Sequence, residues 1–203
     1  LTNANWQGPI QRVADSMGAY LPASLLLFSV IYFGRHHLFE WVEHPIHGKE
    51  FWFEPSFTFT RDVIALLWIT FVSIFYQYLS IRPMLGRARE TATGLRGAIY
   101  QRWTAGWRGE EREREIATRR ARKLAAVLAL SYAICYSLIG IDMIMSLAAE
   151  WVSTMFPAYY AWGGFLSAIS MTTVICLVMR NSSALSGQIT TSRIHDLGKM
   201  VFA

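Results

Sequence analysis

The segment LAAVLALSYAICYSLIGIDMIMSL, residues 124–147, decides the fold class of this chain. Its apolar run is longer than the roughly 20 residues that an α-helix needs to cross the hydrocarbon core of a bilayer. Its only charged residue is Asp142. A carboxylate at membrane depth costs about 2.5–3.5 kcal/mol on insertion scales. The segment therefore predicts a membrane-spanning helix, and it raises the question of what stabilises Asp142 there.

Three further apolar segments have the length of a membrane span. They cover residues 13–33, 63–81 and 152–179, and a fifth apolar segment begins near Leu197. No alternation of the β-strand type competes with helical structure. We predict an all-α polytopic transmembrane helix bundle. Residues 1–203 would form a single transmembrane domain with four complete spans and the start of a fifth, as a fragment of a longer chain.

The composition agrees with a membrane protein. Hydrophobic residues make up 53% of the chain and charged residues only 16%, which is too apolar for an ordinary soluble domain. Eight Trp, nine Tyr and twelve Phe suit a protein that is anchored at lipid–water boundaries. The net charge of +5 does not indicate a nucleic-acid partner, because the basic residues concentrate in one loop between apolar spans.

The distribution of basic residues predicts the orientation. Segment 82–123 contains twelve Lys or Arg, whereas segment 34–61 contains three. Because cytoplasmic loops carry an excess of Lys and Arg, we expect 82–123 to be a cytoplasmic loop and 34–61 to be an outside loop. The N-terminal end and loop 180–195 are expected inside.

The predicted outside loop is rich in aromatic residues and contains His36, His37, His44 and His47. Pro45 would break a helix that aligned His44 with His47, so we predict no metal site. Neither Cys135 nor Cys176 belongs to a C-x-x-C motif, which argues against iron–sulfur and c-type haem ligation by this chain. We expect the aromatic residues of the loop, including Trp41, Phe51 and Trp52, to contact an external partner.

Two groups of polar residues are candidates for proton transfer. Tyr136 and Ser146 lie within about two helical turns of Asp142, so these three residues are one candidate relay. The alternative for Asp142 is an acid near a helix end that reaches the outer interface. His195, Asp196 and Lys199 form the second candidate, a proton mouth at the inner surface, and the alternative is a charged helix cap.

The segment IDMIMSLAAEWVSTMFPAYYAWGGFLSAI, residues 141–169, resembles the NrfD-like (polysulfide-reductase-type) integral membrane subunits. The matching pattern is D-x-x-M-S-L-x-x-x-W-x-S-T-x-F-x-x-Y, from Asp142 to Tyr159. Within the family, the likeness is greatest to the F subunit of alternative complex III, a quinol:cytochrome c oxidoreductase. HDLGKMVFA at 195–203 and WQGPIQRVADSM at 6–17 also resemble that subunit, although Gln11 and Asp15 stand where Arg and Glu are expected.

The resemblance implies a subunit of a quinol-oxidising respiratory complex in the bacterial inner membrane. Such a subunit binds no redox cofactor and has no catalytic residues of its own, and it contributes a proton path, a quinol-site scaffold or both. Quinol would bind nearby, and haem c and iron–sulfur clusters would belong to partners. The expected partners are a sister NrfD-like membrane subunit, an iron–sulfur subunit and a multihaem c-type cytochrome. The alternatives are a cofactor-free ion or proton transporter or channel, and a purely structural membrane anchor.

Overall fold

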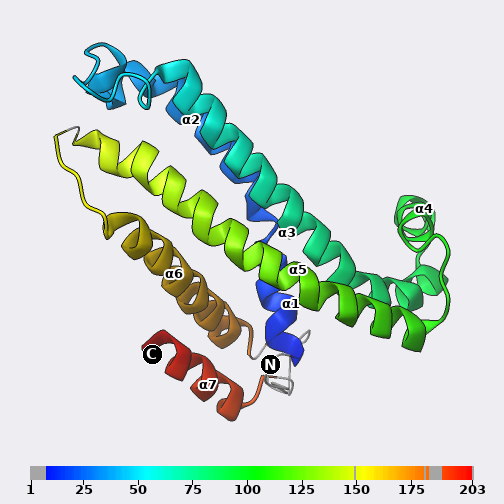
Figure 1. Ribbon diagram of the computed structural model, residues 1–203. Helices are drawn as coiled ribbons and strands as arrows, with labels where there is room; N and C mark the ends of the chain where they lie inside the picture. The colour runs from blue at the N-terminus through cyan, green and yellow to red at the C-terminus, as the bar shows by residue number, and fades with distance from the viewer. Residues whose placement is uncertain (1–7, 149, 181, 183–188, 203) are drawn as a thin grey trace. The chain divides into compact units, whose positions relative to one another are not determined.

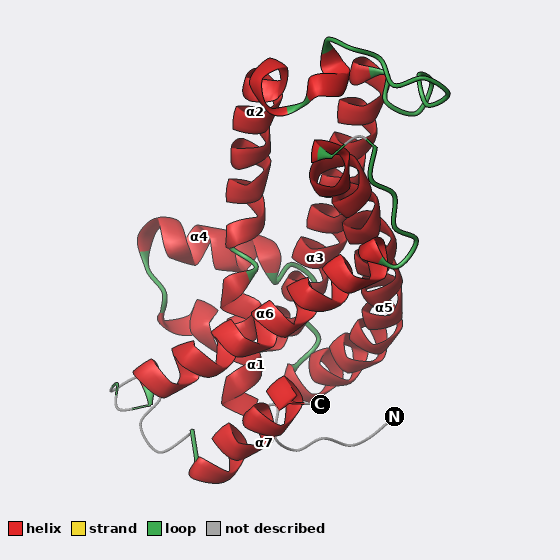
Figure 2. Ribbon diagram, turned by 90° about the vertical axis from the view of Figure 1, so that its left-hand side faces the viewer, coloured by secondary structure: helices red, strands yellow, loops and turns green. Residues whose placement is uncertain are grey.

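The computed structural model describes residues 8–148, 150–180, 182 and 189–202, and every element of regular structure in these residues is a helix (Figure 2). Figure 1 shows the order of these elements along the chain. They are α1 (Gly8–Met17), α2 (Tyr20–Leu38), η1 (Glu40–Val42), α3 (Pro55–Thr91), α4 (Gly94–Trp103), α5 (Glu110–Ile139), η2 (Gly140–Ile144), η3 (Met145–Leu147), α6 (Phe156–Met179) and α7 (Thr191–Phe202). The prediction of an all-α chain is confirmed.

Four helical segments among the described residues are long and apolar enough to cross a membrane. They are Ile10–Leu38, Pro55–Gly86, Glu110–Leu147 and Phe156–Met179. Large apolar side chains point outward along them, for example Leu26, Phe33, Trp162 and Val178, each at least 73% exposed. Lipid-facing helices expose apolar side chains in this way, and the protein is therefore a multi-pass membrane protein.

The helices extend beyond the segments that hydropathy marks. The outside loop, expected at 34–61, is shortened to residues 39–54. Much of the expected cytoplasmic loop 82–123 is helical, because α3 continues to Thr91 and α5 already begins at Glu110. Glu, Arg and Ala, which dominate the start of α5, are strong helix formers. The last helix begins at Thr191, and the expected loop 180–195 lies partly outside the described residues.

The chain separates into two compact units. The first consists of Leu1–Val63 and Cys135–Ala203, and the second of Ile64–Ile134. The sequence predicted a single transmembrane domain. The division instead falls within α3 and within α5, so each of these two helices belongs partly to the first unit and partly to the second.

An aromatic cluster fixes the loop between α2 and α3 in the first unit. Trp41 is almost fully buried, and its ring lies 5.2 Å from Phe39, 5.3 Å from Phe53 and 6.3 Å from Phe59. The loop therefore folds onto the helix ends that it connects (Figure 1). The expectation that Trp41 contacts an external partner is wrong, because the chain's own aromatic rings cover it. Phe51, at 80% exposure, remains available on the surface.

A second core in the first unit joins α1, α6 and α7. Its fully buried members are Ile10, Val13, Cys176, Ile189 and Leu197. Leu197, where a fifth membrane span was expected to begin, lies on α7 and is buried in this core. The fifth span stays a prediction. The burial of these apolar side chains attaches both helices to α6.

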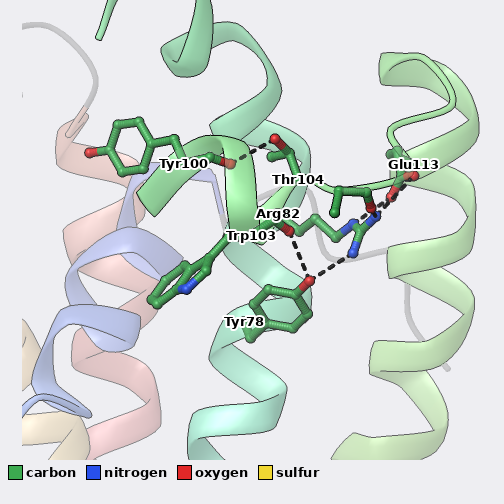
Figure 3. Close-up of polar contacts among 7 residues, drawn as sticks. Tyr78, Arg82, Tyr100, Trp103, Thr104 and Glu113 are labelled. Carbon is green, nitrogen blue, oxygen red and sulfur yellow. Dashed lines mark hydrogen bonds and ion pairs between the residues drawn. The ribbon is translucent and has the colours of Figure 1, made fainter. Parts of the chain in front are cut away.

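The second unit is held together by a buried ion pair between α3 and α5 (Figure 3). Arg82 Nε donates to Glu113 Oε2 at 2.8 Å, and the Glu113 side chain is 6% exposed. Other guanidinium nitrogens donate to the Tyr78 hydroxyl at 2.7 Å and the Ala105 carbonyl at 3.2 Å. The Tyr78 hydroxyl in turn donates to the Trp103 carbonyl at 2.9 Å. Arg82 thus fixes the end of α4 against both long helices.

Removing one partner of this ion pair should destabilise the second unit. Glu113→Ala leaves Arg82 without its counter-ion, which we expect to cost about 3–5 kcal/mol. The double variant Arg82→Met/Glu113→Leu replaces both charges by apolar groups and should recover most of that loss. Thermal unfolding of the purified protein in detergent measures both effects. A double variant no more stable than Glu113→Ala would contradict a balanced ion pair.

The predicted orientation can be tested at two exposed positions. His47 lies in the loop between α2 and α3, and Glu111 lies in the first turn of α5. In intact cells, a membrane-impermeant thiol reagent should label His47→Cys and spare Glu111→Cys, because the Lys- and Arg-rich segment is expected inside. The native Cys135 and Cys176 are buried free thiols, so the background should be low. The opposite labelling pattern would reverse the orientation.

Candidate functional site: a buried charge cluster

Asp142 lies in a short π-helical turn. The α-helical geometry of α5 gives way at Gly140–Ile144 to i→i+5 hydrogen bonding, and Asp142 occupies the middle of this turn. A Cβ added to Gly140 would lie 2.7 Å from Tyr160 Cδ1, so the missing side chain allows α6 to approach closely. Turns of this kind are frequent at functional sites. The Asp142 side chain itself is fully buried.

Asp142 is held by three hydrogen bonds from the loop between α2 and α3 and from α3 itself. Arg61 donates to Asp142 Oδ2 from Nε at 3.0 Å and from a terminal nitrogen at 2.6 Å. The Trp52 indole N–H donates to Asp142 Oδ1 at 3.0 Å. Both carboxylate oxygens are therefore bonded, and a guanidinium supplies the counter-charge. These contacts show how the chain accommodates an acid in an apolar span.

Aromatic rings shield the guanidinium of Arg61 from solvent. The Arg61 Cζ atom lies 4.0 Å from the Trp52 ring centroid and 4.8 Å from that of Phe57. A cation over an aromatic face gains roughly 0.5–2 kcal/mol, more when it is desolvated. Trp52 therefore contacts both members of the pair, through its ring face and its N–H. Its position is fixed by Thr58, whose hydroxyl donates to the Trp52 carbonyl at 2.9 Å.

Asp62 adds a second carboxyl group to the cluster. It lies on α3 directly after Arg61 and is fully buried. It interacts by charge with both Asp142 and Arg61. Among the described residues, no N–H or O–H group donates to either Asp62 oxygen. The cluster of Arg61, Asp62, Asp142 and Trp52, called the charge cluster below, thus contains two carboxyl groups and one guanidinium.

The helix that carries Arg61 and Asp62 begins with a capped first turn. The carboxylate of Glu54 accepts hydrogen bonds from the backbone N–H of Phe57 at 2.6 Å and of Ser56 at 3.2 Å, and Pro55 is the first helical residue. The bond from Phe57 is the main reason that the pKa of Glu54 lies below its usual range. The ionised cap therefore stabilises the helix start above the ordinary carboxyl pKa and is lost as the pH falls through the lowered value.

Ser146 and Tyr136, the other predicted members of the first relay, make different contacts. The Ser146 hydroxyl donates to the backbone carbonyl of Asp142 at 2.5 Å, so it supports the turn. Tyr136 stacks on Tyr160, with ring centroids 4.8 Å apart and planes 13° from parallel. Ser137, one residue further on, donates to the carbonyl of Pro157 at 3.3 Å. These contacts connect the end of α5 to the start of α6.

The second predicted relay lies on α7. Lys199 and Asp196 are 3.7 Å apart, one helical turn from each other, and His195 and Lys199 are exposed. The helix begins after Thr190, whose hydroxyl oxygen accepts from the Arg193 N–H at 3.4 Å. An exposed pair of this type contributes little to stability. The structure thus supplies a charged helix surface here, and the role of a proton mouth stays a prediction.

The positions of the described His, Cys, Asp and Glu side chains determine whether they could form a metal-ligand cluster. No group of three or more His, Cys, Asp or Glu side chains gathers in the described part of the chain. His47, in the loop between α2 and α3, pairs with Glu50 at 3.2 Å, and His36, in the last turn of α2, lies 3.7 Å from Glu43. His36 and His47 thus pair with two different acids.

Arg61, Asp62 and Trp52 are the site residues that sequence reasoning missed. Arg61 was counted with the outside loop, and Asp62 was placed just before a span expected to start at residue 63. The sequence Glu54-Pro55-Ser56 carried a usable signal, because Pro at the first helical position marks a helix start. A helix that starts at Pro55 reaches Asp62 after about 10 Å of rise, which places the two charges inside the helix.

The fold and the site define a multi-pass membrane protein with a buried charge cluster in its spans. Comparison of the chain with protein-family models, curated proteins and solved structures finds no match. The relation to the NrfD-like subunits therefore stays a prediction from the quoted motifs, of which residues 6, 7, 149 and 203 lie outside the described residues.

Trp52→Phe should weaken the charge cluster while keeping an aromatic ring beside Arg61. The variant leaves Asp142 Oδ1 without its donor, which should destabilise the protein by about 1–3 kcal/mol. Trp162→Phe is the matched control, because Trp162 lies exposed on α6. Thermal unfolding in detergent compares the two variants. Equal unfolding midpoints would contradict a structural role for the indole N–H.

Proposed function

We propose that this chain is a membrane subunit of a bacterial inner-membrane respiratory complex that oxidises quinol. In this proposal the chain binds no redox cofactor itself and contributes a proton path beside the quinol site. Haem c and iron–sulfur clusters belong to a multihaem cytochrome and an iron–sulfur subunit, and a sister NrfD-like subunit lies beside it in the membrane. The motif resemblance between Asp142 and Tyr159 supports the choice of complex.

The charge cluster is the observation that supports a proton path through this chain. Two buried carboxyl groups and the guanidinium of Arg61, whose side chain is 14% exposed, lie at the ends of two apolar helical segments. Ionisable residues within membrane spans are rare and are typical of proton relays and ion pathways. Carboxyl groups can take up and release protons, whereas Arg stays protonated under all ordinary conditions. The cluster thus supplies both a group that binds protons and a fixed positive charge that stabilises the deprotonated form.

The same cluster also suits an ion or proton transporter without redox partners. The two functions differ in the proteins that accompany the chain. An affinity-tagged full-length chain, purified from its native membrane, should retain iron–sulfur and haem c partners, which absorption and electron paramagnetic resonance spectra detect. Purification as a symmetric oligomer of this chain alone would contradict the proposal and favour the transporter.

The proton role can be tested with Asp142→Asn in the assembled complex. The variant removes the negative charge that balances Arg61, so Asp62 must take over as counter-ion and no carboxyl group remains free to exchange a proton. We expect quinol oxidation coupled to proton movement to fall at least about tenfold, as for the loss of a general acid–base group. Glu150→Gln, an exposed acid in the turn after η3, is the control.

The measurement is quinol-dependent proton movement in proteoliposomes, together with the subunit composition of each variant. The Glu150→Gln complex should match wild type in both. Wild-type turnover and proton stoichiometry in an assembled Asp142→Asn complex would contradict a proton path through the charge cluster.

A further inference from the structure

The sequence placed the transferable proton on Asp142, but the contacts of the charge cluster distinguish its two acids. Asp142 accepts three hydrogen bonds, two of them from Arg61. Bonds to a guanidinium favour an ionised carboxylate, since an ionised acid has only acceptor sites. Asp142 is therefore the fixed counter-ion of Arg61.

Asp62 has the opposite environment. It is fully buried, and no donor among the described residues reaches either of its oxygens. A buried carboxylate without a hydrogen bond or a counter-ion of its own is strongly unfavourable. Arg61 directs its bonds to Asp142, and its remaining terminal nitrogen has no partner among the described residues. Asp62 is thus not acting as a second counter-ion.

The net charge of the cluster also indicates that Asp62 is not ionised. One guanidinium and one carboxylate neutralise each other, so a second carboxylate would leave the buried site with a net negative charge. Two like charges at close range do not both remain ionised, and one of the two acids keeps its proton. A protonated Asp62 is also a donor, and the neighbouring Asp142 carboxylate is an acceptor with which it interacts.

We infer that Asp62 is the proton-carrying residue of the charge cluster and that Arg61 and Asp142 are positioning residues. In the resting state Asp62 is a neutral carboxylic acid. It releases its proton to the next group of the path and becomes a carboxylate, and Arg61, the adjacent residue, stabilises this charge. Uptake of one proton restores the neutral acid. The transport role rests on the proposed function, whereas the resting protonation state rests on the contacts alone.

Asparagine provides the test, because it is close in shape to a protonated aspartic acid and has no transferable proton. Asp62→Asn should preserve the Arg61–Asp142 pair, so its thermal unfolding midpoint in the purified complex should match wild type. Asp142→Asn disrupts the bonds from Arg61 and should lower the midpoint by about 6–20 °C. The reverse order of stability would overturn the assignment, since Asp62 would then be the ionised acid.

Infrared spectroscopy of the purified complex provides a second readout. The wild-type minus Asp62→Asn difference spectrum should contain the C=O stretch of one protonated carboxylic acid, and this band should shift in D₂O. The wild-type minus Glu150→Gln spectrum should lack it. Absence of the band from the first difference spectrum would overturn the assignment of the resting proton to Asp62.

The transport role is read separately in proteoliposomes. Asp62→Asn should lose at least about tenfold in quinol-dependent proton movement while assembling normally. Wild-type proton movement in this variant would overturn Asp62 as the carrier, even with the infrared band assigned. A wild-type complex that moves no protons would instead contradict the proposed function and leave the protonation state of Asp62 intact.

Discussion

The ion pair between Arg61 and Asp142 is the constraint on which the first unit depends. An isolated charge in an apolar span is unfavourable, and the two charges offset each other only if their geometry is fixed. That geometry involves a turn of π-helix, the first turns of α3 and the indole of Trp52. The loop between α2 and α3 is therefore part of the buried site, because it carries Trp52, and the aromatic cluster around Trp41 holds the loop in place.

Sequence reasoning reached the helical architecture because the apolar segments exceed the length of a bilayer span. It also identified Asp142 as the unusual residue. It did not find the partner, because Arg61 and Asp142 are 81 positions apart and hydropathy carries no information about which helices meet. Arg61 looked like an ordinary boundary residue, since a charge beside an apolar run normally faces water. Only the three-dimensional contacts place its guanidinium on a buried carboxylate.

Each of the two units contains a buried acid that is paired with an arginine. In each, an arginine of α3 reaches a buried acid of α5 or of the turn that follows it: Arg61 with Asp142, and Arg82 with Glu113. The planar guanidinium suits this task, because it donates several hydrogen bonds in one plane and packs against aromatic rings. The two arginines differ in what their other N–H groups contact. Tyr78 and the Ala105 carbonyl occupy further donors of Arg82, whereas one terminal nitrogen of Arg61 has no partner among the described residues.

The π-helical turn at Gly140–Ile144 changes how the surrounding sequence must be read. A π turn contains about one residue more than an α turn, so every later side chain is rotated by roughly 100° from its place on a regular helical wheel. A regular wheel places Ser146 within about 40° of Asp142, yet the hydroxyl of Ser146 bonds to the backbone carbonyl of Asp142. Periodicity counted across Gly140 in related sequences would assign the following residues to the wrong face. The helical periodicity should therefore be counted separately before and after the π turn.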